Sequence, residues 1–411
     1  MKTNDRFLQR NLALFAGCIF AMLLVVLPAI PASAQQRLDP QNLTPQQQQA
    51  FESRLRQLGY EVEYNKLTPE EKERYFRLLQ QAKQNKQKGQ QGKQGQQGKK
   101  GQPPGKMQNA NASNPYNTSL TPLTDFGDKL YEGLKGGLYP NGQNTRPKSH
   151  NEAGLAIAKN IKPLDRKGNV DEKNGKIVWL SIGMSNTTQE TARFLELMKK
   201  HPNKNPSLVL IDGAFGGQAI EQINSPRAPY WDRILTERLK PAGITPEQVQ
   251  VVWFKLAEVR PTDTNFTRYT QSLKERYLSA MQILKTKFPN VKIAYLSSRI
   301  YGGYAKTALN PEPFAWYTGW ANKLLIEEQI KGDPRLAYAG TGKEAKVPWL
   351  SWGPYLWANG TIPNAQGISW VEGDMMPDGT HPSDSGRRKV AEALIKFFST
   401  DETATPWFLK K

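Results

Sequence analysis

Short, continuous apolar segments alternate with longer amphipathic segments in the C-terminal part of the chain, and this alternation limits the fold more than any other feature. The apolar segments have the length of strands and lie at residues 176–182, 208–211, 249–254 and 291–296. The amphipathic segments have helical periodicity and lie at residues 187–199, 230–239, 267–287, 316–330 and 385–398. Because the strand segments are apolar throughout, both of their faces should be buried. The pattern predicts an α/β domain with a parallel central sheet, helices on both faces and a crevice at the carboxyl ends of the strands.

The predicted α/β domain takes residues 118–411, and a targeting segment opens the chain. Residues 1–34 have a basic start, an apolar stretch and an Ala-Ser-Ala pattern at their end, which is typical of a cleaved secretory signal peptide. The mature chain is therefore expected to be secreted or periplasmic. An uncleaved membrane anchor and a lipoprotein modified at Cys18 are the alternatives. After this segment, the sequence predicts no transmembrane helix.

Two further segments separate the signal peptide from the α/β domain. Residues 35–82 contain Leu-Thr-Pro twice, at 43–45 and 67–69, and each copy opens a helical pattern, which predicts a small helical hairpin. Residues 83–117 are predicted to be a disordered linker. Their first part, 83–106, holds seven Lys, eight Gln and six Gly with no acidic or apolar residue. Such a composition cannot bury enough surface to offset the entropy of ordering.

The net charge of +19 suggests an anionic partner, but much of it lies outside the α/β domain. The linker contributes seven of these charges and the first 34 residues two, so residues 107–411 keep +10. The linker is therefore interpreted as a solvated spacer, with loose contact with an anionic cell surface as the functional alternative, and no specific nucleic-acid partner is expected. The single cysteine, Cys18, lies in the signal peptide, which excludes disulfides, a Cys nucleophile and thiolate metal sites from the mature chain.

A serine follows the first predicted strand at the point where a helix begins. The run at 181–187 reads Ser-Ile-Gly-Met-Ser-Asn-Thr. A serine on such a Gly-containing turn exposes its hydroxyl beside free backbone N–H groups, as a nucleophile with an oxyanion intermediate requires. Ser185 is therefore a candidate nucleophile. The alternative is that Ser185 or Thr187 only caps the helix.

The loop before the last predicted helix holds a carboxylate and an imidazole three residues apart. Asp378 can accept the Nδ1–H of His381, so that Nε2 is free to take a proton from a serine. The other two histidines, His150 and His201, lie in polar stretches and are expected at the surface. A turn with helix-capping polar residues is the alternative. A zinc site lacks the usual set of ligands, so no metal or other cofactor is expected.

These two motifs resemble the first and last blocks of the SGNH (GDSL-type) hydrolases, whose Ser, Asp and His follow in that order. The runs Gly-Met-Ser-Asn at 183–186 and Asp-Gly-Thr-His-Pro at 378–382 carry the resemblance, which extends over residues 176–400. The Gly-Xaa-Ser-Asn form is most similar to the sialic-acid and xylan acetylesterase branch. The resemblance implies a three-layer α/β/α, flavodoxin-like SGNH-hydrolase domain and ester hydrolysis through an acyl-enzyme, without a cofactor.

The resemblance also implies an oxyanion hole, and the middle blocks of the family match this chain less well. The family places an oxyanion-hole glycine in the loop after the second strand, where Gly216, or else Gly217, is the counterpart. Together with the backbone N–H of Ser185, Gly216 would hold the oxyanion. The alternative for both glycines is an ordinary turn.

After the third strand, the family has an Asn, or a Gln-Gly-Glu run in the acetylesterase branch, and this chain has Lys255 instead. Lys255 is predicted to replace the missing side-chain donor of the oxyanion hole. The alternative is an ion pair between Lys255 and Glu258 or Asp212.

The loop after the fourth strand, residues 297–304, is polar, aromatic and rich in glycine. Arg299 and Tyr301 are predicted to bind substrate because they come just past a strand end. Five of the ten tryptophans lie between Trp316 and Trp357. We expect them to pack in the core, with stacking on sugar rings as the alternative.

Together these features predict an exported serine esterase that removes acetyl or another small acyl group from a carbohydrate. Ser185 attacks the ester, His381 transfers the proton and Asp378 orients His381. The alternative from another class is a non-catalytic, surface-associated carbohydrate-binding protein on the same scaffold. The missing Asn favours this alternative, whereas the complete set of Ser, Asp and His opposes it.

Overall fold

The computed structural model describes residues 39–57, 63–69, 72–73, 75–76, 79, 118–339, 342 and 344–410. The chain divides into two compact units, Met1–Lys106 and Met107–Lys411. The predicted signal peptide and the predicted linker lie outside the described residues. Within the described ranges, no helix is both long and apolar enough to cross a membrane.

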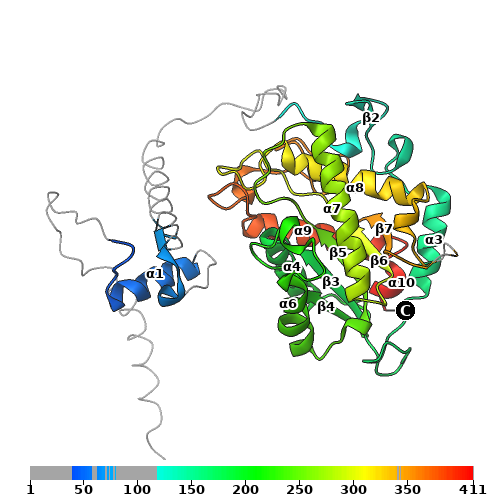
Figure 1. Ribbon diagram of the computed structural model, residues 1–411, viewed down its shortest axis with the longest axis horizontal. Helices are drawn as coiled ribbons and strands as arrows, with labels where there is room; N and C mark the ends of the chain where they lie inside the picture. The colour runs from blue at the N-terminus through cyan, green and yellow to red at the C-terminus, as the bar shows by residue number, and fades with distance from the viewer. Residues whose placement is uncertain are drawn as a thin grey trace, which may run out of the picture. The chain divides into compact units, whose positions relative to one another are not determined.

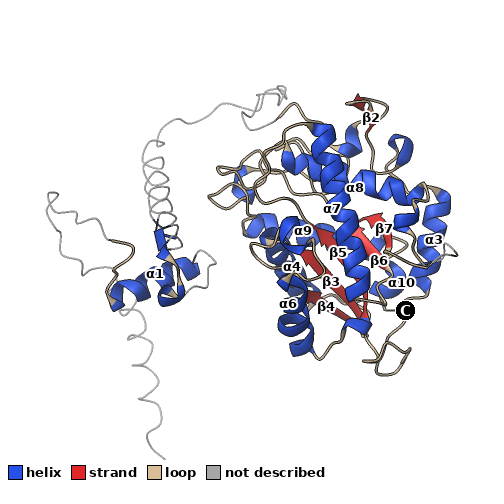
Figure 2. Cartoon of the chain, viewed as in Figure 1, coloured by secondary structure: helices blue, strands red, loops and turns tan. Residues whose placement is uncertain are grey.

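The second unit contains a main sheet, a small hairpin and flanking helices (Figure 2). The strands of the main sheet are β3 (Ile177–Gly183), β4 (Leu208–Asp212), β5 (Val249–Lys255), β6 (Ile293–Leu296) and β7 (Trp349–Trp352). The longer helices are α3 (Lys148–Lys159), α4 (Ser185–Met198), α7 (Phe266–Lys287), α8 (Phe314–Ile330) and α9 (Asp384–Thr400). The shorter elements are β1 (Leu130–Tyr131), β2 (Leu134–Lys135), α5 (Ile220–Ile223), α6 (Pro229–Arg233) and α10 (Thr405–Phe408). A π-helical turn at Ile234–Leu239 continues α6.

The main sheet is parallel and has the strand order β4-β3-β5-β6-β7. Numbered along the chain, this order is 2-1-3-4-5, which is that of flavodoxin-like folds. The predicted flavodoxin-like α/β fold is therefore confirmed. The four predicted strands coincide with β3 to β6 to within two residues at each end. The fifth strand, β7, was not predicted, because it has only four residues and a serine interrupts its apolar pattern.

Successive side chains of β5 point to opposite buried faces of the sheet. Trp253 stacks on Trp179 at 6.2 Å between ring centroids, and Trp179 contacts Phe194 of α4. The next residue, Phe254, packs against Tyr277 of α7 at 5.2 Å. Helix α4 packs on α9, and α7 packs on α8, which Figure 1 shows with α7 crossing in front of the strands. The sheet is thus covered on both sides, as its continuous apolar strands require.

All ten tryptophans of the chain are buried, and the five between Trp316 and Trp357 belong to the main hydrophobic core. Their predicted role in core packing is confirmed. The prediction that His150 lies at the surface is wrong. His150 is 4% exposed, its Nε2–H donates to the Leu350 carbonyl at 2.8 Å, and its ring stacks on Trp349. Burial lowers the pKa of His150 to about 4.

The first unit has a helix and a small hydrophobic cluster of its own. Helix α1 (Pro45–Gln57) starts with a capping box. In this box the Thr44 N–H donates to Gln47 Oε1 at 2.8 Å, and the Gln47 N–H donates to Thr44 Oγ1 at 3.4 Å. The cluster consists of Leu43, Phe51, Leu55 and Tyr64. Much of residues 70–82 lies outside the described part, so the second helix of the hairpin stays a prediction.

Candidate active site

Ser185, His381 and Asp378 form a continuous chain of hydrogen bonds at the carboxyl ends of the strands. The Oγ of Ser185 lies 2.8 Å from Nε2 of His381. On the other side of the ring, Nδ1 of His381 lies 2.5 Å from Oδ2 of Asp378. The structure therefore brings the two sequence motifs together across 196 residues of chain.

The turn between β3 and α4 presents Ser185. Helix α4 begins at Ser185, so the N–H groups of its first turn have no acceptor within the helix. Only glycine fits at position 183, because a Cβ there would lie 2.2 Å from Thr187 Oγ1 and 2.6 Å from the Lys255 carbonyl oxygen. Thr187 Oγ1 in turn donates to that carbonyl at 2.7 Å. These contacts fix the turn and leave Ser185 half-buried.

The loop of His381 is fixed by its own backbone. Asp378 Oδ1 accepts the backbone N–H groups of Thr380 at 2.9 Å and of His381 at 3.0 Å, which leaves Oδ2 for the imidazole. Gly379 has a φ of +70°, and a Cβ there would lie 1.7 Å from the Tyr304 carbonyl oxygen. A side chain at position 379 would therefore disrupt the Asp–His geometry.

The ionisation state of Asp378 sets the direction of the hydrogen bonds between Asp378, His381 and Ser185. Burial acts to raise its pKa, but the hydrogen bond and charge of His381, with the two backbone N–H groups, hold the pKa below its ordinary value. An ionised Asp378 accepts the Nδ1–H of His381, so Nε2 is left to accept the Ser185 hydroxyl. The side chains of Asp378 and His381 are 19% and 20% exposed. This arrangement can activate a serine for attack on a substrate that enters from solvent.

Two polar contacts that the sequence did not predict support the serine turn. The Nδ2 of Asn186 donates to the Thr380 carbonyl at 2.9 Å, which ties the serine turn to the histidine loop. Asp212, at the end of β4, accepts from Ser181 Oγ at 2.8 Å and from the hydroxyl of Thr188. In the sequence, only the position of Asn186 beside Ser185 could have indicated a role for it in the site.

Gly216 lies in an exposed loop beside the serine turn. The preceding backbone N–H, that of Phe215, donates to the Gly183 carbonyl at 3.2 Å, so the loop after β4 is attached to the turn before Ser185. No atom of the described residues lies within 4 Å of the position that a Cβ would take on Gly216 or Gly217. The space beside both glycines is open. The oxyanion role of Gly216 stays a prediction that this placement allows.

Lys255 does not lie where an oxyanion donor is needed. Its side chain is fully buried, and its ammonium donates to both carboxylate oxygens of Glu190 at 2.7 Å each. An ammonium without exposed surface cannot contact a substrate oxygen, so the predicted oxyanion role is corrected to a structural ion pair. The predicted partners are also wrong, since Glu258 pairs with Arg276 at 2.9 Å and Asp212 bonds to hydroxyl groups.

The pair of Lys255 and Glu190 is costly to bury. Burial lowers the pKa of Lys255 to about 8, although the charge of Glu190 opposes this shift. Burial also raises the pKa of Glu190, and Lys255 opposes that shift in turn. Each charge is therefore stabilised mainly by the other, and the removal of one would leave the other buried without its ion-pair partner.

Arg299 and Tyr301 do not reach the surface either, so their predicted contact with substrate is corrected. Arg299 is 1% exposed and Tyr301 is 0% exposed, because the loop after β6 folds inward. The backbone N–H of Arg299 donates to Thr318 Oγ1 at 2.9 Å, and the ring of Tyr301 packs on Trp357 at 5.8 Å. Both side chains are buried in the interior of the α/β unit.

The described residues contain no group of three or more His, Cys, Asp and Glu side chains that could hold a metal ion.

The sequence matches no family model and no curated protein. Seven chains of known structure are similar to it. A Bacteroides fragilis protein assigned as an acylhydrolase is 12% identical, with 61% of this chain and 97% of that chain covered and a TM-score of 0.33. A GDSL-like lipase from Bacteroides thetaiotaomicron is 13% identical, with coverages of 60% and 95% and a TM-score of 0.31. The periplasmic domain of a lipopolysaccharide acetyltransferase from Salmonella ser. Paratyphi A is 12% identical, with coverages of 60% and 95% and a TM-score of 0.27. Because these similarities are so low, the class of the protein has to be inferred from the geometry of its own site.

Proposed function

We propose that this chain is a serine ester hydrolase of the SGNH (GDSL-type) superfamily. The observation that carries the proposal is the unbroken hydrogen-bonded series from Ser185 through His381 to Asp378. The chain order of the three residues, the spacing of three between Asp378 and His381, and the flavodoxin-like sheet support it. A helix-capping role for Ser185 does not account for its contact with the imidazole.

In the proposed reaction, His381 Nε2 takes the proton of Ser185 as Oγ attacks the ester carbonyl. The backbone N–H groups of Ser185 and Gly216 hold the oxyanion. The proton then passes from His381 to the departing alcohol, and the acyl group stays on Oγ. A water molecule, deprotonated by His381, attacks this acyl-enzyme, and His381 returns the proton to Ser185 Oγ as the bond between Oγ and the acyl carbon breaks and the carboxylic acid leaves. Asp378 orients the ring throughout and stabilises its protonated form.

We infer that the substrate is an acylated carbohydrate outside the cytoplasm, with acetyl as the foremost acyl group. The signal-like segment at 1–34 supports export, and the Gly-Met-Ser-Asn run supports a small acyl group through its resemblance to acetylesterases. Gly216 and Gly217 are exposed, so a substrate can reach this loop from solvent. The basic linker is proposed to make loose contact with an anionic cell surface.

One observation favours a second candidate, a non-catalytic carbohydrate-binding protein on the same scaffold. With Lys255 buried in its ion pair, the position that the resemblance assigns to a side-chain oxyanion donor offers none. An oxyanion hole made of backbone N–H groups alone would stabilise the oxyanion less than one that also has a side-chain donor.

Labelling with a fluorophosphonate, which reacts only with an activated serine, separates the two candidates. The secreted protein is incubated with the probe, and the labelled residue is identified by mass spectrometry. We expect label on Ser185, its loss in Ser185→Ala and His381→Ala, and its retention in the control His201→Ala, whose histidine lies near Ser399 and not near the triad. A folded protein that takes no label would overturn the serine hydrolase and favour the binding protein.

A further inference from the structure

The structure has a cavity of about 700 Å³ that the three residues of the proposed active site do not line. The walls of the cavity come from residues 138–151, 352–354 and 365–368 and from one side of α9. Cavities that bind small molecules have volumes of roughly 300–1,000 Å³. The cavity is therefore large enough to hold a ligand of its own.

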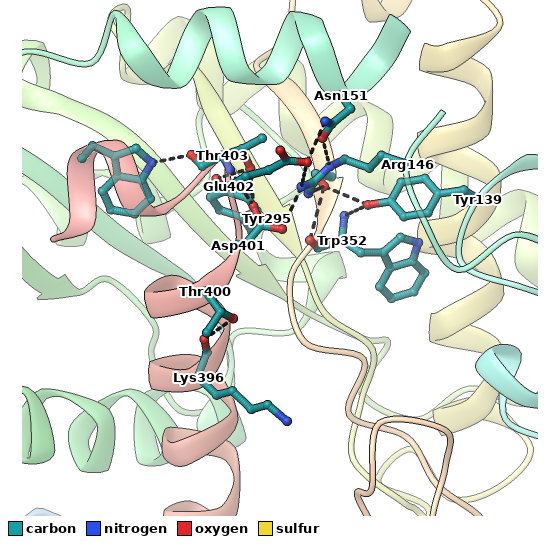
Figure 3. A network of polar contacts seen from close by, with 12 residues as sticks. Tyr139, Arg146, Asn151, Tyr295, Trp352, Lys396, Thr400, Asp401, Glu402 and Thr403 are labelled. Atoms are coloured by element: carbon teal, nitrogen blue, oxygen red, sulfur yellow. Dashed lines mark hydrogen bonds and ion pairs between the residues drawn. The ribbon is translucent and has the colours of Figure 1, made fainter. Parts of the chain in front are cut away.

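Arg146 forms a rigid polar floor in this cavity. Its side chain is 10% exposed. Its Nε donates to Asn151 Oδ1 at 2.8 Å, Nη1 donates to Ser351 Oγ at 3.0 Å, and Nη2 donates to Asp401 Oδ2 at 2.8 Å. These contacts, drawn in Figure 3, occupy three of the five N–H donors of a guanidinium. The planar group is held in place with donors left for a ligand.

Helix α9 supplies the opposite wall with both polar and apolar groups. Ala393, Lys396 and Phe397 line the cavity at the spacing of one helix face. Lys396 is exposed and has no ion pair within the described part of the chain, and Figure 3 draws no contact to its ammonium. Phe397 and Ile368 are partly buried and add apolar surface. A ligand would thus meet hydrogen-bonding groups on one side and apolar surface on another.

The charges that line the cavity cancel. They are Arg146, Lys389 and Lys396 against Glu392, Asp401 and Glu402. Two of the cations are already paired, Arg146 with Asp401 at 2.8 Å and Lys389 with Asp374 at 2.5 Å. Within the described part of the chain, every other charge of the lining has an ion-pair partner and Lys396 is exposed to solvent, which screens its charge, so the lining as a whole favours an uncharged ligand.

An uncharged ligand with many hydroxyl groups and an apolar ring face fits this lining. Hydroxyl groups both donate and accept, so they can use the remaining donors of the guanidinium, the carboxylates of Glu392 and Glu402 and the amides of Asn144 and Gln366 together. The C–H face of a sugar ring can lie against Phe397. We propose that this cavity is a non-catalytic binding site for uncharged saccharide units.

Such a site would act beside the proposed active site without depending on it. A glycan held in the cavity raises the effective concentration of its other units near the domain that carries Ser185. The lining does not include the triad, so binding should survive the loss of the nucleophile. Failure of the proposed hydrolysis and failure of this site can therefore be observed separately.

Calorimetric titration of the full-length secreted chain tests the site. The probes are three neutral hexasaccharides (cellohexaose, xylohexaose and chitohexaose) and hexagalacturonate as the charged counterpart. We expect at least one neutral hexasaccharide to bind, and to bind Ser185→Ala equally well. Ala393→Phe fills the cavity from α9 and should raise the Kd at least about tenfold. The matched control Ala156→Phe, at an exposed position of α3 outside the lining, should leave the Kd unchanged.

Thr400→Phe, at an exposed position of the same lining, gives a second blocking variant with little risk to folding. Thermal melting establishes that each variant is folded. Hydrolysis of 4-nitrophenyl acetate by Ala393→Phe should equal that of the unmodified protein. Failure of every neutral probe to bind, binding of hexagalacturonate alone, or unchanged binding in both folded blocking variants would overturn the proposal.

Discussion

The loops at the carboxyl ends of the strands form two groups that differ in what they do with polar side chains. The loops after β3 and before α9 keep Ser185 and His381 partly exposed and bonded to each other. The end of β5 and the loop after β6 bury Lys255, Arg299 and Tyr301 completely or nearly so. A polar residue just past a strand end is thus a poor indicator of function by itself, because it can equally be buried as part of the core.

Chain length between elements explains why Ser185 stays exposed and why the loop after β6 can be buried. Only Met184 separates β3 from α4, so the serine turn has no length with which to fold inward. The connection from β6 to α8 runs from Ser297 to Pro313, long enough to fold back and be covered by other segments. Lys255 is the last residue of β5 and is buried between its neighbours in the sheet and α4. The strand ends thus carry a reactive group of residues, Ser185 and His381, and a structural group of residues, Lys255, Arg299 and Tyr301.

The largest effect is expected in the reactive group. Ser185→Ala and His381→Ala should each lower turnover of an acetyl ester by about 10³-fold or more, because triad members act as a unit. Thermal stability should change little, since both side chains are partly exposed. Hydrolysis of 4-nitrophenyl acetate and thermal melting check the two expectations, with His201→Ala as the control. Full activity in Ser185→Ala would remove the serine from the reaction.

In the structural group, loss of the ion pair between Lys255 and Glu190 should lower stability and leave turnover nearly unchanged. Lys255→Met leaves Glu190 buried without a partner, so the free energy of unfolding should fall by about 3–5 kcal/mol. Turnover per folded molecule should stay nearly the same. Urea unfolding and activity normalised to the folded fraction measure the two quantities.

The double variant Lys255→Met/Glu190→Leu is the matched control for this pair. Removal of both charges should recover most of the lost stability, because neither group then remains buried and unpaired. A loss of turnover of about 10²-fold in folded Lys255→Met, with unchanged stability, would instead restore the oxyanion role.

His150 extends the same comparison to the dependence of stability on pH. His150 is buried with a pKa of about 4 against its ordinary value of 6.5, so between these pH values the unfolded chain binds more protons than the folded one. The contribution of His150 to stability is therefore complete above pH 6.5 and declines as the pH falls toward 4, by up to about 3 kcal/mol. Unfolding measured across this range should show a shallower decline in His150→Gln, which has an N–H donor but does not titrate. An equal decline in both proteins would contradict the buried, neutral state of His150.

The sequence predicted the features that depend on local pattern. Continuous apolar segments located β3 to β6, and the spacing of three between Asp378 and His381 located the Asp–His pair. Contacts across the fold had no such signal. The partner of Lys255 lies 65 residues away on α4, and nothing in the residues around Glu190 marked it as a buried carboxylate. Helix α3 was likewise missed, and with it the burial of His150.

The smallest effect is expected from removal of the first unit. A variant that begins at Met107 should keep the melting temperature and the activity of the full chain, because residues 107–411 have a core of their own and the cluster around Leu43 belongs to the first unit. Melting and ester hydrolysis on the two proteins check this, and a marked loss of activity would show that the first unit contributes to the site.

A deeper truncation provides the control for that experiment, because Thr118 is tied to the α/β unit. The Thr118 N–H donates to Asn359 Oδ1 at 2.8 Å, and Asn359 Nδ2 donates to the Thr118 carbonyl at 2.7 Å. A variant that begins at Leu123 loses both bonds and leaves the buried amide of Asn359 unpaired, which should cost about 1–3 kcal/mol. If the two truncations were equally stable, the boundary of the folded unit would lie after Thr118, and its pairing with Asn359 would not contribute to the stability of the unit that carries the reactive loops.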